Sequence, residues 1–131
     1  MMVEIELLFD DGIKVDGELD ESKNPITTRA IVNALPIESR ANRWGDEIYF
    51  STPVNVGEEN AQEEVRVGDI AYWPPGKALC IFFGPTPVSR GSEPRAASPV
   101  NVIGRVKGDL TLLKKVKNRS KVIVRIKGEA R

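Results

Sequence analysis

The strongest structural signal in this chain is the stretch GDIAYWPPGKALCIFFG, which runs from Gly68 to Gly84. It holds four of the eight aromatic residues in the 131-residue chain, together with two prolines and three glycines. Two short apolar runs flank the Pro-Pro-Gly segment, a pattern typical of a β-hairpin. Because neither run alternates with polar residues, both faces of the hairpin need cover, as in a closed barrel or a sandwich. The stretch therefore predicts a β-rich core and indicates no reaction.

Alternating apolar and polar residues predict further strands around this hairpin. Residues 3–7 alternate strictly, as do residues 13–19, and Asp10-Asp11-Gly12 between them has the composition of a hairpin turn. Four more strands are expected at residues 48–50, 63–67, 100–106 and 122–126. Asn24 and Pro25 predict the start of a helix, because asparagine caps helices and proline suits the first helical position.

Two further segments complete the expected architecture. Asp109 is expected to cap a short helix from Leu110 to Val116, and the proline-rich segment Pro85–Pro99 is expected to be a long loop of the kind that lines sites. The length fits a single domain over residues 1–131. The predicted fold is mainly β, a closed β-barrel of about eight strands with one or two short helices, closed by pairing of the terminal strands.

The composition excludes several kinds of chemistry. The chain has no histidine, which excludes Ser-His-Asp and Cys-His catalysis and histidine-ligated metals. Cys80 is the only cysteine, which excludes an intramolecular disulfide, and its apolar neighbours predict a small buried hydrophobe. The sequence has no phosphate-binding glycine loop and no metal-ligand spacing. We therefore expect no cofactor and no metal.

The net charge is zero but unevenly distributed. Residues 1–24 contain eight acids and two bases, whereas residues 101–131 contain ten bases and two acids. A basic segment can bind nucleic acid, but no aromatic platform or binding motif accompanies this one. We favour internal pairing between neighbouring terminal strands, in which acidic side chains face basic ones. The acids are Glu4, Glu6, Asp16 and Glu18, and the bases are Lys121, Arg125 and Lys127. No nucleic-acid partner is expected.

Nothing in the sequence predicts a membrane partner. The longest uncharged apolar run, from Ala78 to Gly84, is too short to span a bilayer. The N-terminus carries acids rather than a basic flank and an apolar signal core. A cytoplasmic location is expected, and the sequence does not define the oligomeric state.

Aromatic and acidic residues supply the site candidates. The aromatic set is Tyr49, Phe50, Tyr72, Trp73, Phe82 and Phe83, and alternation predicts that one residue of each adjacent pair faces the barrel interior. In the segment Trp44-Gly45-Asp46-Glu47, Trp44 could stack on a ligand and Glu47 could accept a hydrogen bond. The alternative is a loop anchored by its tryptophan, with solvated acids. Asp46 and Glu47 are adjacent, so they are not expected to form a catalytic dyad.

Three stretches, in this order, resemble the cyclophilin fold. Residues 15–35, which include Val15-Asp16-Gly17 and Asn24-Pro25-Ile26, are similar to the cyclophilin passage from strand to helix. Residues 68–83 look like its central strand pair, and residues 102–116 like its final strand and helix. Residues 44–50 and the Tyr-Trp-Pro-Pro-Gly hairpin resemble more closely a small prokaryotic family of atypical cyclophilin-like proteins of unassigned function. The resemblance implies a cyclophilin-like β-barrel over the whole chain.

Cyclophilins are peptidyl-prolyl isomerases that use a hydrophobic proline pocket and an arginine near the twisting amide. The resemblance matches Phe83 to a pocket phenylalanine and places Trp73 where a small pocket residue is expected. The catalytic arginine belongs at the end of the third strand, where this chain has Tyr49-Phe50-Ser51-Thr52. The tryptophan and histidine of the distal loop have no counterpart between Glu93 and Pro99.

The combined prediction is a barrel that binds a proline-containing peptide or a small molecule, with little or no isomerase activity. The expected ligand-binding residues are Trp73, Phe83, Trp44, Glu47 and Tyr49, and no catalytic residue is assigned. One alternative is a divergent isomerase that uses Arg40, Arg43 or Arg95 from a loop. Another is a small-molecule enzyme that relies on Glu47 or Tyr49.

Overall fold

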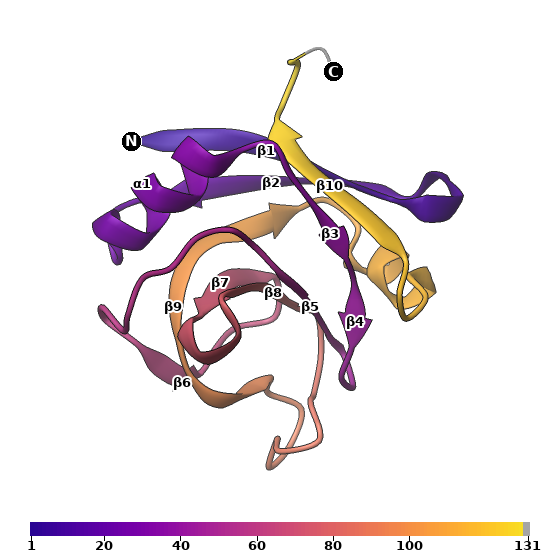
Figure 1. Ribbon diagram of the computed structural model, residues 1–131. Coiled ribbons are helices and arrows are strands. Elements are labelled where there is room, and N and C mark those ends of the chain that lie inside the picture. Colours follow the sequence, from indigo (N-terminus) through magenta and orange to yellow (C-terminus); the bar gives the residue numbers. More distant parts are fainter. Residues whose placement is uncertain (130–131) are drawn as a thin grey trace.

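The computed structural model describes residues 1–129, and this part of the chain is mainly β, as predicted. Its ten strands are accompanied by one α-helix and three short 3-10 helices (Figure 1). In chain order the elements are β1 (Met2–Phe9), η1 (Asp10–Gly12), β2 (Lys14–Asp20), α1 (Pro25–Ala34), β3 (Ile37–Arg40), β4 (Asn42–Arg43), β5 (Glu47–Ser51), β6 (Gln62–Glu64), β7 (Asp69–Trp73), η2 (Pro74–Gly76), β8 (Ala78–Phe82), β9 (Arg95–Lys107), η3 (Leu110–Lys115) and β10 (Lys121–Ile126).

The strands form one curled sheet in the order β3-β10-β1-β2-β9-β7-β8-β5-β4, and β6 pairs with β9 beside this path. The predicted closure of a barrel by the terminal strands is not observed: the β1–β10 pair lies within the sheet, and among the described residues no hydrogen-bonded ladder joins its two ends. The backbone makes that connection, because only Ala41 separates β3 from β4. The run Ile37–Arg43 thus pairs with β10 at its start and with β5 at its end.

The terminal strands are neighbours, as predicted, since β1 and β10 pair antiparallel with Glu6 opposite Arg125. Glu6 is almost fully buried and lies between two cations, Lys14 at 2.7 Å and Arg125 at 3.1 Å. Hydrogen bonds from these side chains, that from Lys14 first, hold the pKa of Glu6 below its usual value. The predicted charge pairing between terminal strands is confirmed for Glu6 with Arg125.

Two more of the predicted acids also pair with bases. Lys127 contacts Asp16 at 3.0 Å, and Glu18 pairs with Lys107 of β9 at 3.8 Å rather than with a residue of β10. The Lys121 side chain forms no ion pair with residues 1–129; its backbone N–H donates to Asp10 instead.

The hairpin of β7, η2 and β8 is buried on both faces, as its sequence predicts. One face joins the large inner cluster enclosed by the curled sheet, with Ile70, Tyr72, Leu79 and Ile81. The other face joins a smaller cluster, called here the outer cluster, which consists of Val65, Ala71, Cys80, Phe82, Ala96, Val100 and Val102. Cys80 is buried there as a free thiol, in agreement with the prediction.

Strand β9 is thirteen residues long and curves around the hairpin (Figure 1). Its second half pairs with β2 and β7, and its first half pairs with β6, outside the main path. The register with β7 shifts between Ile70, which pairs with Gly104, and Ala71, which pairs with Val102. A Cβ at Gly104 would collide with the carbonyl oxygen of Glu18, so this glycine lies both at the register shift and at a close approach of two backbones.

The prediction of a loop over Pro85–Pro99 is wrong for its last part. Residues from Arg95 onward belong to β9, because they pair with β6. This partner lies about thirty residues earlier in the chain, and the prolines and small residues of the segment give no periodic signal for it.

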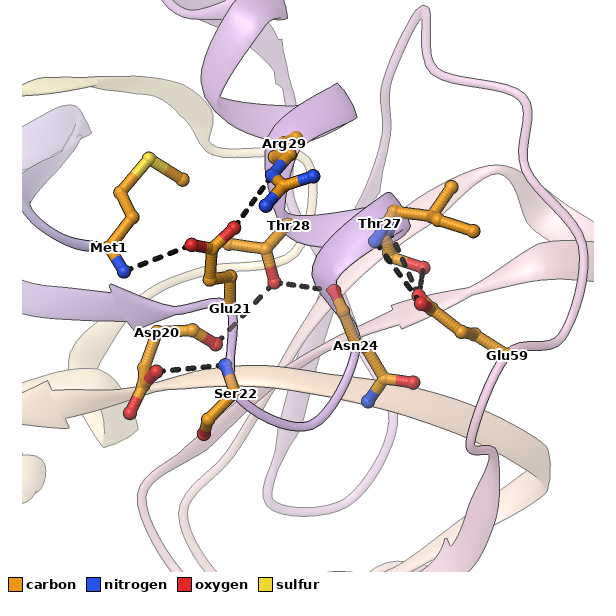
Figure 2. A network of polar contacts seen from close by, with 10 residues as sticks. Met1, Asp20, Glu21, Ser22, Asn24, Thr27, Thr28, Arg29 and Glu59 are labelled. Atoms are coloured by element: carbon orange, nitrogen blue, oxygen red, sulfur yellow. Dashed lines mark hydrogen bonds and ion pairs between the residues drawn. The ribbon is translucent and has the colours of Figure 1, made fainter.

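Helix α1 begins at Pro25, as predicted, but Asn24 does not cap it with its side chain. The Asn24 amide donates to Val102 O at 2.7 Å and accepts from Asn60 N at 2.7 Å. Glu59 caps the helix instead, accepting hydrogen bonds from the N–H groups of Ile26 and Thr27 at 3.1 Å (Figure 2). A carboxylate suits this position because helix N-termini carry unpaired N–H donors and a positive dipole end.

We predict that Gly104→Ala destabilises the protein by roughly 1–3 kcal/mol, because a methyl group at this site overlaps the backbone of β2. Gly57→Ala is the matched control, since its added methyl meets nothing within 4 Å. Urea unfolding of both variants measures the difference. Equal stability of the two variants would contradict the close approach of β9 to β2.

Candidate functional site

A pocket of about 230 Å³, called here the aromatic pocket, opens beside the outer cluster. Its walls come from β5, β7, β9 and the turn before β5. The lining residues are Trp44, Glu47, Tyr49, Trp73, Ala96, Ala97 and Val100. The curvature of β9 places its first half over the hairpin, which is why small apolar residues of that strand form one wall.

Trp44 and Glu47 face the pocket together because a two-residue turn joins them. Their backbones exchange hydrogen bonds, Trp44 N to Glu47 O at 2.9 Å and Glu47 N to Trp44 O at 3.2 Å. Gly45, the first turn residue, has φ of 61°, a conformation that glycine adopts readily. Residues opposite each other in such a pair project to the same face of the sheet. The local sequence Trp44-Gly45-Asp46-Glu47 thus brings an aromatic ring beside a carboxyl.

The aromatic walls are held in fixed positions. The Trp73 indole donates from Nε1 to Ser98 Oγ at 2.7 Å. The rings of Tyr49 and Trp73 have centroids 6.4 Å apart and planes inclined by 70°, so they form a corner and not a stack. All three aromatic residues of the pocket are only partly buried. Their exposed ring surface is available to a ligand.

Glu47 is the one charged residue in the pocket lining, and it is only 5% exposed. Burial raises its pKa from 4.5 to about 7, partly offset by a hydrogen bond with the Cys80 side chain. Burial, and then the charge of Glu47, raise the pKa of the Cys80 thiol. The Glu47 atom Oε1 has no hydrogen-bond partner among residues 1–129. A buried carboxyl group with a pKa near 7 and an unpaired oxygen can bind a cation, accept or donate a hydrogen bond, or transfer a proton near neutral pH.

Phe83, the fifth predicted ligand-binding residue, does not line this pocket. Phe82 is opposite Glu47 and joins the outer cluster, so the next residue projects to the other side. Phe83 therefore packs into the inner cluster, where the guanidinium of Arg43 lies 5.2 Å from its ring centroid. The structure brings Trp44, Glu47, Tyr49 and Trp73 together and places Phe83 apart from them.

None of the three candidate loop arginines lines the aromatic pocket. Arg43 stacks on Phe83 and donates to the carbonyl of Val116 at 2.9 Å. Arg95 pairs with Glu64 at 3.0 Å. Arg40 donates to the carbonyl of Arg119 at 3.1 Å and lines a neighbouring pocket.

This neighbouring pocket, of about 310 Å³, shares Tyr49 and Trp73 with the aromatic pocket as common walls. Its other lining residues are Ser39, Arg40, Asn42, Ser51, Gly76, Ala78 and Arg119. Sequence reasoning did not identify Arg119 or the small residues of β9. Only the proline-rich composition of residues 85–99, which predicted a site-lining segment, pointed towards Ala96 and Ala97.

Residues 1–129 contain no group of three or more His, Cys, Asp or Glu side chains arranged to hold a metal ion. In the same range, no helix has the length and apolar character needed to cross a membrane.

A family model described as cyclophilin-like matches residues 3–125, which extend from β1 into β10. The chain belongs to the cyclophilin-like family. The resemblance predicted from three stretches of sequence is thereby confirmed over nearly the whole chain. No curated protein matches this cyclophilin-like chain.

Solved structures extend the comparison. The hypothetical protein AF2241 from Archaeoglobus fulgidus is 47% identical, with a TM-score of 0.79 over 95% of this chain and 94% of that one. McbB, solved in complex with tryptophan, is 21% identical with a TM-score of 0.79, over 97% of this chain and 46% of its own. A cyclophilin-type peptidyl-prolyl cis-trans isomerase of Cryptosporidium parvum has 12% identity and a TM-score of 0.55, over 99% of this chain and 100% of its own. At these identities, the comparisons with McbB and with the Cryptosporidium parvum protein show a shared fold and nothing more.

We predict that the Glu47 contribution to the free energy of unfolding falls by on the order of 3 kcal/mol as the pH rises from 4.5 to about 7, and changes little at higher pH. Glu47 has a higher pKa in the folded than in the unfolded chain, so between these two values the folded protein binds more protons. Its stabilising proton is fully present below pH 4.5 and is lost as the pH passes the folded value of about 7.

Urea unfolding from pH 4.5 to 8.5 tests this, with Glu47→Gln expected to flatten the profile. Glu63→Gln, a change at an exposed acid of β6, is the control and should leave the slope unchanged. Parallel profiles for the wild type and Glu47→Gln would contradict the raised pKa.

Proposed function

We propose that this cyclophilin-like protein is a binding module that holds a peptide segment or a small ligand in the pocket of Trp44, Glu47, Tyr49 and Trp73, with little or no prolyl isomerase activity. The observation that carries the proposal is the unpaired, buried carboxyl oxygen of Glu47 beside three partly exposed aromatic rings. A buried polar atom without a partner is unfavourable, and a ligand that contacts Glu47 would remove this penalty.

The composition of the pocket argues against efficient isomerisation. Rotation about an amide bond has a barrier of about 18–20 kcal/mol, which an enzyme lowers by binding the twisted amide more tightly than the planar one. The family's arginine provides that binding. No arginine or lysine of the described chain lines the aromatic pocket, where the charged group is an acid. A carboxylate cannot replace a cationic donor at the amide.

A divergent isomerase is the second candidate, and one observation favours it. Arg40 lies in the neighbouring pocket, across the wall formed by Tyr49 and Trp73. A peptide that occupies both pockets would present its backbone to this arginine. Arg43 and Arg95 are weaker candidates, because both are held by other groups of the protein.

Two structural relatives suggest ligands to test. McbB was solved in complex with tryptophan, and the Cryptosporidium parvum protein is a cyclophilin-type peptidyl-prolyl cis-trans isomerase. Their identities to this chain are 21% and 12%, so they share its fold without assigning its ligand. Proline-containing peptides and tryptophan therefore belong in the same binding panel.

We predict that ligands of this pocket shift the indole N–H resonances of Trp44 and Trp73 in ¹H–¹⁵N spectra. These are the only tryptophans of the chain, so Trp44→Phe assigns both signals. Trp73→Ala should weaken binding at least tenfold, because it removes a wall of the pocket. If no peptide and no small molecule shifts either resonance, the site assignment is wrong.

We also predict that a protease-coupled assay on Xaa-Pro peptides detects no turnover above the uncatalysed rate. Turnover clearly above background, abolished by Arg40→Gln and retained by Arg90→Gln, would favour the divergent isomerase. Arg90 serves as the control because it is exposed and lines neither the aromatic pocket nor its neighbour.

A further inference from the structure

The aromatic pocket combines three ring systems with one carboxyl group, and this combination restricts the charge of its ligand. Aromatic faces carry a negative partial charge that attracts cations. Tyr49 and Trp73 form a corner, with ring planes at 70°, and Trp44 adds a further wall. Three aromatic residues around a small cavity are typical of sites that recognise alkylated ammonium groups.

The electrostatics of the pocket point the same way. Glu47 is the one ionisable acid or base in its lining apart from the Tyr49 phenol. Arg43 and Arg95, which lie next to lining residues in the sequence, pair with other acids: Arg43 with Asp46 at 3.7 Å and Arg95 with Glu64 at 3.0 Å. Attraction between opposite charges is strong where water is excluded. The unpaired Oε1 of Glu47 also lacks a hydrogen-bond donor, which a protonated amine would provide.

We propose that the pocket binds a small organic ammonium ion, whose alkyl groups pack against Trp44, Tyr49 and Trp73 while its charge pairs with the Glu47 carboxylate. This inference rests on the proposed function and names its ligand class. The N–H of a tertiary ammonium would donate to the Glu47 carboxylate, whereas a quaternary ammonium would supply charge alone.

Binding of a cation should depend on pH through Glu47. Its pKa of about 7 in the free protein means that protonation competes with the cation as the pH falls. The other titratable groups that face it are the Cys80 thiol of β8, whose raised pKa keeps it neutral, and the phenol of Tyr49 on its own strand. The lining residues from β7 and β9 do not titrate: Trp73, Ala96, Ala97 and Val100. Affinity is therefore expected to fall about tenfold per pH unit below 7.

Three probes of similar shape separate the contributions of charge and hydrogen bonding: N,N-dimethylethanolammonium, choline and the uncharged 3,3-dimethylbutanol. Titrations at pH 8, followed by the two indole resonances, should show both cations binding at least tenfold more tightly than the alcohol, or about 1.4 kcal/mol. N,N-dimethylethanolammonium should bind at least as tightly as choline. An alcohol that binds as tightly as choline would overturn the proposal.

Variants test the role assigned to Glu47. Glu47→Gln should lower the affinity for choline at least tenfold and abolish its pH dependence, while Glu63→Gln should leave both unchanged. Folding of the Glu47→Gln variant is checked by unchanged indole shifts in the absence of ligand. If Glu47→Gln does not fold, Trp44→Ala provides the test, because this partly exposed wall residue should be needed for choline binding. Unaltered choline binding in a folded Glu47→Gln or Trp44→Ala protein would overturn the proposal.

Further ligands distinguish the source of the ammonium group. They also show whether a negative result contradicts only the ammonium proposal or the proposed binding function as well. A peptide that contains dimethyllysine and binds more tightly than N,N-dimethylethanolammonium would assign the group to a protein side chain; weaker binding would assign it to a free small molecule. Either result supports the ammonium chemistry. If only neutral peptides or tryptophan shift the indole resonances, the ammonium class is wrong and the proposed function stands. If no probe shifts them, both fail.

Discussion

The close approach of β9 to β2 at Gly104 is the constraint on which the rest of the structure depends. With no side chain at this position, the backbone of β9 lies directly against the carbonyl of Glu18, and its register with β7 shifts at the same point. Strand β9 therefore belongs to two parts of the structure. Its second half completes the curled sheet, and its first half, with β6, covers the outer face of the central hairpin. A straight β9 would leave Phe82 and Cys80 uncovered, and the aromatic pocket would lose the wall formed by Ala96, Ala97 and Val100.

The pocket retains a feature that a purely structural layer would not need. An apolar residue at position 47 would bury without a desolvation penalty, whereas the carboxyl of Glu47 has an unpaired oxygen and a pKa raised by burial. Natural proteins tolerate such locally unfavourable groups most often at functional sites. The short turn at Gly45-Asp46 fixes Glu47 opposite Trp44, so the backbone that creates the unfavourable burial also places the carboxyl beside its aromatic neighbours.

Much of this arrangement could be predicted from the sequence, where the signals are local. Alternation located the paired terminal strands, and the unbroken apolar runs of residues 68–84 predicted a hairpin covered on both faces. Non-local contacts could not be predicted. The capping of α1 depends on Glu59, which lies more than thirty positions away, and the pairing of β9 with β6 was hidden by prolines. Phe83 was assigned to the site through resemblance, although strict alternation from Phe82 places it on the inner face.

The pairing of β1 with β10 also has a consequence for the nascent chain. Glu6 and Arg125, which meet across this pair, are 119 positions apart in the sequence. At a translation rate of about 5–20 residues per second, the first strand leaves the ribosome roughly 6–24 seconds before its partner. During this interval the β1–β2 hairpin has an unpaired edge that could associate with other chains. Glu4, the exposed acid of this edge strand, opposes such association until β10 covers the edge, whereas Glu6 already has Lys14 of the same hairpin as its partner.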